Sequence, residues 1–328
     1  MPRIGYHCSH EQYPPSRLLQ LVQRAEKAGF QSAMCSDHFF PWADPQGESG
    51  FAWSWLGAAM QATSIPFGVV TVPGGWRYHP AIIAQAAATL AEMYPGRFWI
   101  APGSGELLNE HITGERWPHK AERNARLREG CDIIRALWAG ETVTHHGLIT
   151  VEEAKLYTRP EAPPRIVGAA LTPETAEWMG SWADGLITTV GERADMRKVI
   201  EGFRRGGGEG KPIYLQAQLS FHRSDAEAVR AAHAQWKHLQ FPSSVLAQLR
   251  LPSEFEAAAE FVRPDDIARK VRCSASVEQH LDWLLSDVEM GFEEINLHSI
   301  PRENQEHFID VFGERVLPEL KRATSLGA

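Results

Sequence analysis

The chain has 328 residues, of which 43% are hydrophobic and 23% charged, a composition typical of a globular protein and not of a disordered chain or a coiled coil. Its formal net charge of -8 at pH 7 and its isoelectric point near 6.0 disfavour nucleic acid and anionic membranes as main partners, because both bind to basic surfaces.

The cysteines and the N-terminus indicate the compartment. The four cysteines are widely spaced and form no zinc or redox pair, which is typical of buried thiols in a reducing compartment: Cys8, Cys35, Cys131 and Cys273. The N-terminal segment lacks the apolar core of a signal peptide, and no apolar run approaches the length needed to cross a bilayer. We therefore expect a soluble, cytoplasmic protein with no membrane partner.

Eight short apolar runs alternate with helical segments along the chain, a pattern typical of parallel βα units. The predicted strands are Arg3–His7, Gln31–Cys35, Phe67–Val72, Arg97–Ala101, Arg165–Ala169, Gly185–Thr189, Ile213–Phe221 and Glu294–His298. The predicted helices cover Arg17–Lys27, Phe51–Thr63, His79–Met93 and Ala121–Trp138, begin near Thr172 and Arg193, and end with Ser276–Glu289 and Asn304–Lys321.

Two segments fit no βα unit. Glu141–Arg159 alternates like a hairpin and is interpreted as an insertion, and Ser224–Lys270 is predicted to form a helical excursion over one end of the fold. Eight strands alternating with helices favour an α/β fold of the closed (β/α)8 TIM-barrel type over an open sheet. Because the chain shows no internal repeat and no linker, we expect one domain over residues 1–328.

The densest group of chemically active side chains is Ser36–Trp42, directly after the second predicted strand. Taken alone, this pattern also fits an ordinary loop with a capping Asp37 and a packed His38 and Trp42. In a parallel barrel, however, the carboxyl ends of the strands meet at one mouth. Such convergence favours a functional site, because an acid and a base on different loops can face each other across a bound molecule. The segments expected at this mouth are His7–Glu11, Asp37–Trp42, Thr71–Gly75 and Ser104–Asn109.

Two other motifs are weak. The turn Gly103-Ser104-Gly105-Glu106 lacks the full spacing of a dinucleotide fingerprint, so its meaning rests on its place at the mouth, where small residues let a flat ring approach the backbone. The 14 histidines raise the question of a metal, but the adjacent His145 and His146 point to opposite faces of a strand and no metal-binding motif occurs. We predict no metal site, and a metal-dependent hydrolase is a minor alternative.

Three segments together are specific enough to indicate a family: Ser36–Trp42, Trp76–Gln85 and Gly105–Glu110. On these residues the chain resembles the luciferase-like monooxygenase superfamily, and within it the group of deazaflavin-dependent glucose-6-phosphate dehydrogenases. The resemblance covers nearly the whole chain and is strongest up to about Trp138. It implies an eight-stranded barrel, usually a homodimer, that binds coenzyme F420 or FMN at the mouth formed by the carboxyl ends of the strands.

The resemblance also implies roles for single residues. Asp37 would hold the ring of the cofactor, His38 would act as base on the substrate when an alcohol is oxidised, and Glu106 would exchange a proton with the ring. Trp42 and Glu11 would position the substrate oxygen. The other implied cofactor residues are Ser104, Gly105 and Asn109 at the ring pocket, Val70 and Thr71 in a bulge that backs the ring, and Thr172 at the phosphate of the cofactor tail.

Departures from this group limit the substrate. Where the sugar-phosphate dehydrogenases place lysines for the phosphate, an approximate alignment puts Glu192 and Ala257 here, while Lys270 falls near their arginine. Glu192 would repel a phosphate dianion, so we expect a substrate other than glucose 6-phosphate. Leu171-Thr172 replaces paired glycines at the cofactor tail, which brings the sequence closer to a related subgroup that uses an ordinary flavin.

The expected function is hydride transfer between FMN or coenzyme F420 and a small organic substrate. One alternative is an FMN-dependent monooxygenase that acts with molecular oxygen, and another is a non-catalytic flavin-binding barrel, against which the intact Asp37, His38 and Glu106 argue. The expected partners are a small-molecule substrate, a second copy of the chain and, if FMN is the cofactor, a flavin reductase. Ser224–Lys270 is expected to cover the mouth and to set substrate choice.

Overall fold

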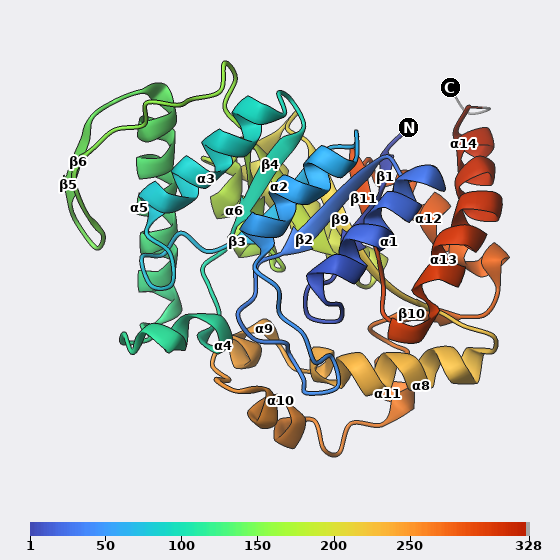
Figure 1. Cartoon of the computed structure of the whole chain (residues 1–328). Coiled ribbons are helices and arrows are strands. Elements are labelled where there is room, and N and C mark those ends of the chain that lie inside the picture. The colour runs from blue at the N-terminus through green and yellow to red at the C-terminus, as the bar shows by residue number, and fades with distance from the viewer. Residues whose placement is uncertain (326–328) are drawn as a thin grey trace.

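The computed structural model describes residues 1–325 and shows a closed parallel barrel of eight strands surrounded by helices (Figure 1). Neighbours pair in chain order around the barrel, and the last strand pairs with the first, which closes it. The predicted (β/α)8 TIM barrel is thus confirmed, and each strand begins and ends within one residue of its predicted limits. The barrel strands are β1 (Arg3–Cys8), β2 (Ser32–Ser36), β3 (Phe67–Thr71), β4 (Phe98–Pro102), β7 (Arg165–Ala169), β8 (Gly185–Thr189), β9 (Ile213–Phe221) and β11 (Glu294–Ser299).

The helices pack apolar faces against the outside of the barrel. In α1 (Pro15–Lys27) the buried residues recur at helical spacing: Leu18, Leu21, Val22 and Ala25. α3 (Pro80–Met93) begins after His79, whose ring accepts a hydrogen bond from Ala81 N and so caps the helix. The other surrounding helices are α2 (Ala52–Ala62), α5 (Lys120–Ala139), α6 (Pro173–Gly180), α7 (Arg193–Phe203), α12 (Val277–Val288), α13 (Gln305–Val311) and α14 (Leu317–Ser325).

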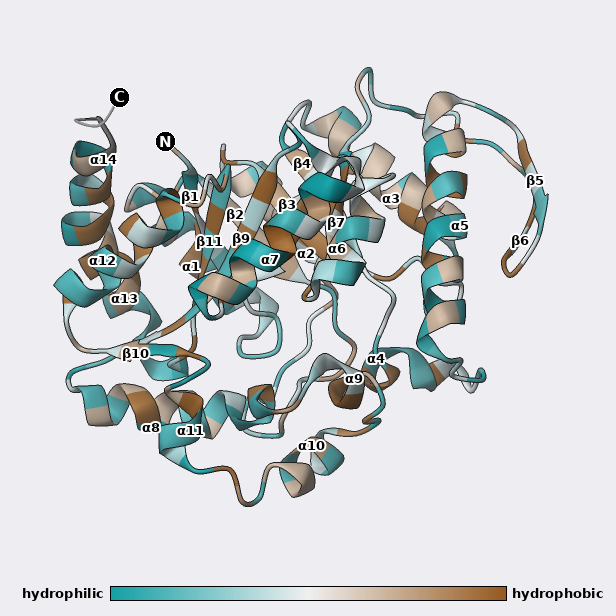
Figure 2. Cartoon of the chain, turned by 180° about the vertical axis from the view of Figure 1, so that it is seen from behind, coloured by the Kyte–Doolittle hydropathy of each residue, from teal (hydrophilic) through white to brown (hydrophobic). Residues whose placement is uncertain are grey.

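Hydrophobic residues are concentrated on the barrel strands, while the outer helices alternate between hydrophilic and hydrophobic residues (Figure 2). This distribution is expected for helices that pack one face against the sheet and expose the other face to solvent. Among residues 1–325, no helix combines the length and the apolar character needed to span a bilayer.

The interior of the barrel has an apolar side and a polar side. On the polar side, where β1, β2 and β11 meet, Ser32 and Asn296 are buried, and Gly5 faces them so closely that a Cβ there would lie 2.0 Å from Asn296 Oδ1. Because inward positions alternate along a strand, the next inward residues toward the carboxyl ends are His7 and His298. The polar side therefore leads to the mouth. The apolar side is formed by Met34, Trp99, Ala101, Val167, Ile187 and Tyr214.

The predicted hairpin is present. β5 (Val143–His146) and β6 (Thr150–Ala154) pair in antiparallel fashion and lie beside α5, away from the barrel (Figure 1).

The predicted excursion is helical but is divided into short segments. It contains α8 (Asp225–Trp236), α9 (Ser243–Leu246), α10 (Pro252–Ala258) and α11 (Pro264–Ile267), which lie below the carboxyl ends of the barrel strands in Figure 1. Prolines at or just before the start of the last three segments interrupt any longer helix. A short strand that was not predicted, β10 (Arg272–Ser274), then pairs with β9.

We expect the barrel interior to be intolerant of added volume at Gly68 in β3. A Cβ at this position would lie 2.1 Å from the indole of Trp99, so Gly68→Ala forces a packed ring to move and should lower the free energy of unfolding by about 1–3 kcal/mol in urea titrations. Gly57→Ala in α2 is the control, because no atom lies within 4 Å of its new Cβ and helix interiors favour alanine over glycine. A Gly68→Ala protein as stable as the wild type would contradict this account.

Candidate functional site

The carboxyl ends of the barrel strands form one mouth, above α4 (Leu107–Glu110) and the excursion (Figure 1). The loops after β2, β3 and β4 are tied together there. Asp37 lies at the start of the loop after β2. Gly103 N donates to Thr71 O at 2.8 Å, which joins the loops after β3 and β4. Asn109 Oδ1 accepts from Phe39 N at 2.8 Å, which joins the first loop to the third. The three loops are therefore joined by hydrogen bonds into one rim.

Asp37 is buried and accepts hydrogen bonds from three side chains at the rim. Its carboxylate receives Tyr78 OH at 3.1 Å, Thr71 Oγ1 at 3.3 Å and Arg77 Nη1 at 3.4 Å. Arg77 Nη2 also donates to the backbone oxygen of Asp37 at 2.7 Å. All of these donors belong to β3 and the loop after it, so this one segment fixes the position of Asp37.

Arg77 is paired with a second buried carboxylate, that of Glu110. Its Nε lies 3.5 Å from Glu110 Oε1, and its backbone nitrogen donates to Glu110 Oε2 at 3.1 Å. The guanidinium also lies over the ring of Tyr78, 4.5 Å from the centroid. The Arg77 side chain is 7% exposed and those of Asp37 and Glu110 are 0% exposed, so the guanidinium and the carboxylates offset part of each other's desolvation.

Three residues of this network are not among the predicted site residues: Arg77, Tyr78 and Glu110. Two of them lie in the loop after β3 and the third lies in α4, after β4. Their position after barrel strands was the signal that could have identified them, since residues there face the mouth.

The predicted catalytic residues lie together beside this network. His38 Nδ1 is 3.7 Å from Glu11 Oε1, and the ring centroids of His38 and Trp42 are 5.0 Å apart. The hydroxyl of Ser9 donates to Glu11 Oε2 at 2.9 Å. Glu106 is close enough to Glu11 for their charges to interact, so the structure gathers all four residues at the mouth.

Burial sets unusual protonation states at the mouth. Desolvation, with a smaller effect from the charge of Arg77, lowers the pKa of His38 to about 4. Desolvation, together with the negative charges of Glu110 and Glu11, raises the pKa of Glu106 to about 8. Burial also raises the pKa of Glu11 to about 7. At neutral pH these shifts favour a neutral imidazole on His38 and a protonated carboxyl group on Glu106, a combination that suits general base and acid chemistry.

The turn after β4 contains Ser104, Gly105 and Glu106, which are partly exposed. Gly105 has φ +86°, and a Cβ there would lie 3.0 Å from the ring of Trp117. Glycine is required at this position on both counts. At Gly103 the nearest atom to an added Cβ is Thr71 O at 4.0 Å, so the backbone on this side of the rim is open.

One expected feature of the cofactor pocket is absent. The pairing of β3 with β4 runs without a register shift through Val70↔Ala101 and Thr71↔Pro102, so the expected bulge at Val70 and Thr71 is wrong. The ladder between β2 and β3 continues past the end of β2, where Asp37 N donates to Val70 O at 2.9 Å. This bond keeps β3 regular. Val70 packs on the apolar side of the barrel interior.

Thr172 lies after β7, at the start of α6. Its hydroxyl oxygen accepts from Thr175 N at 3.3 Å and caps that helix. The positions that align approximately with the phosphate ligands of the related dehydrogenases, Glu192, Ala257 and Lys270, are all exposed to solvent.

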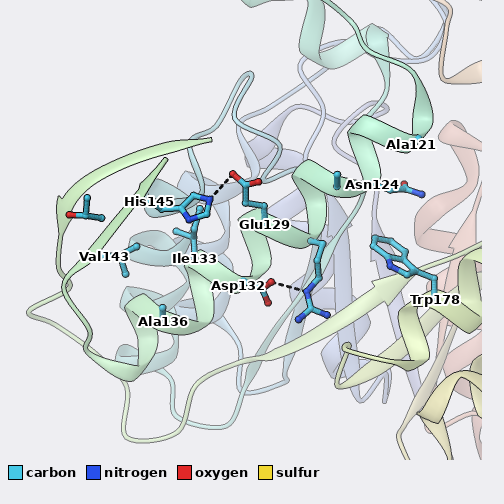
Figure 3. A pocket seen from close by; sticks show the side chains of 12 residues that line it. Ala121, Asn124, Glu129, Asp132, Ile133, Ala136, Val143, His145 and Trp178 are labelled. Carbon is cyan, nitrogen blue, oxygen red and sulfur yellow. Dashed lines mark hydrogen bonds and ion pairs between the residues drawn. The ribbon is translucent and has the colours of Figure 1, made fainter. Parts of the chain in front are cut away.

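A hollow of about 790 Å³ lies elsewhere, between α5, the β5–β6 hairpin and Trp178 (Figure 3). Its charged side chains are already paired: His145 Nε2 lies 2.9 Å from Glu129 Oε1, and Arg128 Nε donates to Asp132 at 2.8 Å. It contains none of the predicted site residues, so we place the chemistry at the mouth. Among residues 1–325, no group of three or more His, Cys, Asp or Glu side chains is arranged to hold a metal ion.

Solved structures support the same architecture. An F420-dependent secondary alcohol dehydrogenase in complex with an F420-acetone adduct superposes with a TM-score of 0.88 at 32% identity, over 98% of this chain and 99% of that one. The coenzyme F420-dependent tetrahydromethanopterin reductase of Methanopyrus kandleri superposes with a TM-score of 0.75 over 97% of this chain and 99% of that one. At 19% identity, the second likeness concerns the fold alone.

Curated relatives match along nearly their whole length. The F420-dependent glucose-6-phosphate dehydrogenase of Beutenbergia cavernae is 34% identical over 331 residues, which is 98% of each chain. The enzyme of the same name from Kribbella flavida is 33% identical, again over 98% of each chain. Residues 1–294 also match the family model described as luciferase-like monooxygenase. With the barrel and its mouth built as described, this chain belongs to the luciferase-like monooxygenase family.

Proposed function

We propose that this protein is an oxidoreductase that transfers a hydride between a small organic substrate and coenzyme F420 or FMN. The observation that carries the proposal is the gathering of His38, Glu11, Trp42 and Glu106 at one mouth beside Asp37 and Arg77, where burial favours a neutral His38 and a protonated Glu106. Of the two cofactors, coenzyme F420 is favoured by the names of the relatives that are more than 30% identical.

The residues at the rim fit a flat, polar ring system. The nearest atom to a Cβ added at Gly103 would be Thr71 O at 4.0 Å, so a ring could approach the backbone closely there. Asp37 and Glu106 follow β2 and β4, on either side of the loop after β3, and would offer an acceptor and a donor to the polar edge of such a ring. When bound, the cofactor would supply the group that accepts or releases the hydride.

The chain's own residues would handle the protons. His38, neutral at pH 7, can take the proton from the substrate hydroxyl as the alcohol is oxidised. Trp42 and Glu11, which contact or flank His38, would hold the substrate oxygen toward it. Glu106 holds a proton on its carboxyl group that it can release into the mouth. Asp37, fixed by Arg77, would orient the ring.

The substrate proposed here is not glucose 6-phosphate. Glu192 and Ala257 offer no cation to a phosphate, and both are exposed to solvent. A dianion also has little to gain among the carboxyl groups of Glu11, Glu106 and Glu110. We further propose that the enzyme works in the cytoplasm as a homodimer, as the family resemblance implies; light scattering of the purified protein would test the dimer.

We expect the purified protein to quench the fluorescence of coenzyme F420 in a saturable titration, and to reduce bound F420 when a secondary alcohol is added. FMN titrated in parallel is the comparison. Saturable binding of FMN alone, with oxygen consumption when reduced FMN is supplied by a flavin reductase, would instead favour the monooxygenase alternative. Binding of a cofactor without turnover of any alcohol or of oxygen would favour the non-catalytic barrel.

Replacing His38 by Ala should lower kcat for alcohol oxidation by about 10²–10⁴-fold, because a positioned general base contributes that much, while the dissociation constant of the cofactor changes little. His119→Ala, at an exposed position before α5, is the matched control and should behave like the wild type. A His38→Ala protein with wild-type kcat would remove His38 from the mechanism.

The pH profile should be bell-shaped. For the alcohol-oxidising direction, kcat/KM should rise as His38 loses its proton near pH 4 and fall as Glu106 loses its proton near pH 8. Glu106→Gln should lower the rate and abolish the fall above pH 8. Glu115→Gln, which changes an exposed carboxylate nearby, should keep it. A fall that persists in Glu106→Gln would assign the upper limb to another group.

A further inference from the structure

Five histidines crowd one side of the mouth and are called the histidine lobe here: His7, His10, His38, His238 and His298. Four of them are at most 3% exposed, and the His38 side chain is 11% exposed. They come from four separate parts of the chain. The lobe continues the polar side of the barrel interior, since His7 and His298 are inward residues of β1 and β11.

The lobe has a floor and a cover. On the floor, the rings of His7 and His298 stack with centroids 4.1 Å apart. The cover is the excursion, in which His238 stacks on Trp42 at 5.3 Å with an interplanar angle of 15°. Trp42 also lies 5.0 Å from His38, so the cover reaches the proposed catalytic base, and His7 of the floor lies close enough to His38 for their charges to interact.

The lobe holds buried hydrogen-bonding atoms without partners. His298 Nδ1 lies 3.3 Å from the side-chain amide nitrogen of Gln216, which engages that side of the ring. Among residues 1–325, His298 Nε2 is buried without a hydrogen-bond partner, and so are His7 Nδ1 and both ring nitrogens of His238. Each such group costs about 1–3 kcal/mol when unsatisfied, and native proteins keep few of them without a reason.

The charges around the lobe select an uncharged partner. Burial lowers the pKa of both His238 and His298 to about 3, so these rings are neutral at physiological pH. Nearby cations are already engaged: Arg77 with Asp37, and Lys237 with Glu256 at 2.5 Å. Neutral imidazoles offer hydroxyl groups both a donor and an acceptor but give an anion little compensation for its desolvation.

We propose that His298 from the floor and His238 from the excursion bind hydroxyl groups of the substrate next to the carbon that reacts at His38. The substrate class is then an uncharged, polyhydroxylated alcohol, or the corresponding hydroxyketone. This inference rests on the proposed function and names the substrate class of the same site.

The substrate reaches these nitrogens when the excursion lifts from the mouth. Within residues 1–325, the hydrogen bonds of the excursion to the loops of the mouth are made by two residues. Ala247 O accepts from Trp117 Nε1 at 3.0 Å and from Leu107 N at 3.2 Å. Gln235 accepts from Gln12 at 3.0 Å and from Gln46 at 3.1 Å and donates to Pro45 O at 3.3 Å. These bonds are individually weak in net terms, which allows the excursion to open and then close over the bound substrate.

The test compares steady-state reduction of the bound cofactor by erythritol or glycerol, by 2-propanol, and by the anion lactate. The wild type should prefer the polyols to both others in kcat/KM. His298→Phe and His238→Phe, which keep a ring but remove its nitrogens, should each lower kcat/KM for polyols about 10–100-fold, as expected for a lost buried hydrogen bond of 1.4–2.8 kcal/mol, and affect 2-propanol much less. His298→Gln, which keeps an N–H donor, should restore part of the loss.

His146→Phe, on the exposed hairpin, is the matched control, and fluorescence titration of the cofactor should be unchanged in every variant. If His298→Phe does not fold, His238→Phe tests the proposal from the excursion alone. A wild type that prefers 2-propanol or lactate, or variants that lose both alcohol classes equally, would overturn the inference and leave the proposed function intact. A wild type that reduces no cofactor with any alcohol would overturn the proposed function itself.

Discussion

The guanidinium of Arg77 is the charge on which the mouth depends. It is nearly inaccessible to water, and it faces the two buried carboxylates of Asp37 and Glu110 from a third loop. Removing Arg77 would leave both carboxylates buried without their cation, at a cost of about 3–5 kcal/mol. Because each partner comes from a different βα loop, the same set of charges fixes the shape of the rim. Electrostatic balance and loop geometry are therefore one constraint here.

Burial and the charge of Arg77 together set the protonation states of the groups at the mouth. Asp37 receives that charge directly, together with two hydroxyl donors. Burial, with the charges of Glu110 and Glu11, favours the protonated form of Glu106. Burial, with a smaller effect from Arg77, keeps His38 neutral. Desolvation thus prepares one group as an acid and the other as a base, a division that catalytic sites commonly use.

The eight barrel strands could be predicted because each is a short apolar run bounded by turn residues, and the convergence of Asp37, His38 and Glu106 followed from topology alone. Other features depended on contacts between distant segments. In the sequence Arg77 is an ordinary loop residue. Its structural role comes from its pairing with carboxylates that lie 40 and 33 residues away in the chain. β10 is too short to give a periodic signal and exists because β9 offers it an edge. The regular end of β3, where a bulge was expected, is likewise decided by its neighbours on both sides.

The strand that closes the barrel is also the last to be made. β1 pairs with β11 from Arg3↔Glu294 to Tyr6↔Leu297, and Tyr6 OH donates to Gln305 at 3.0 Å. At about 5–20 residues per second on the ribosome, β1 keeps one free edge for roughly 15–60 s after it emerges. The floor of the histidine lobe, which joins His7 to His298, forms only at the end of that interval. Nascent chains thus carry an exposed strand edge, open to pairing with other chains, through most of their synthesis.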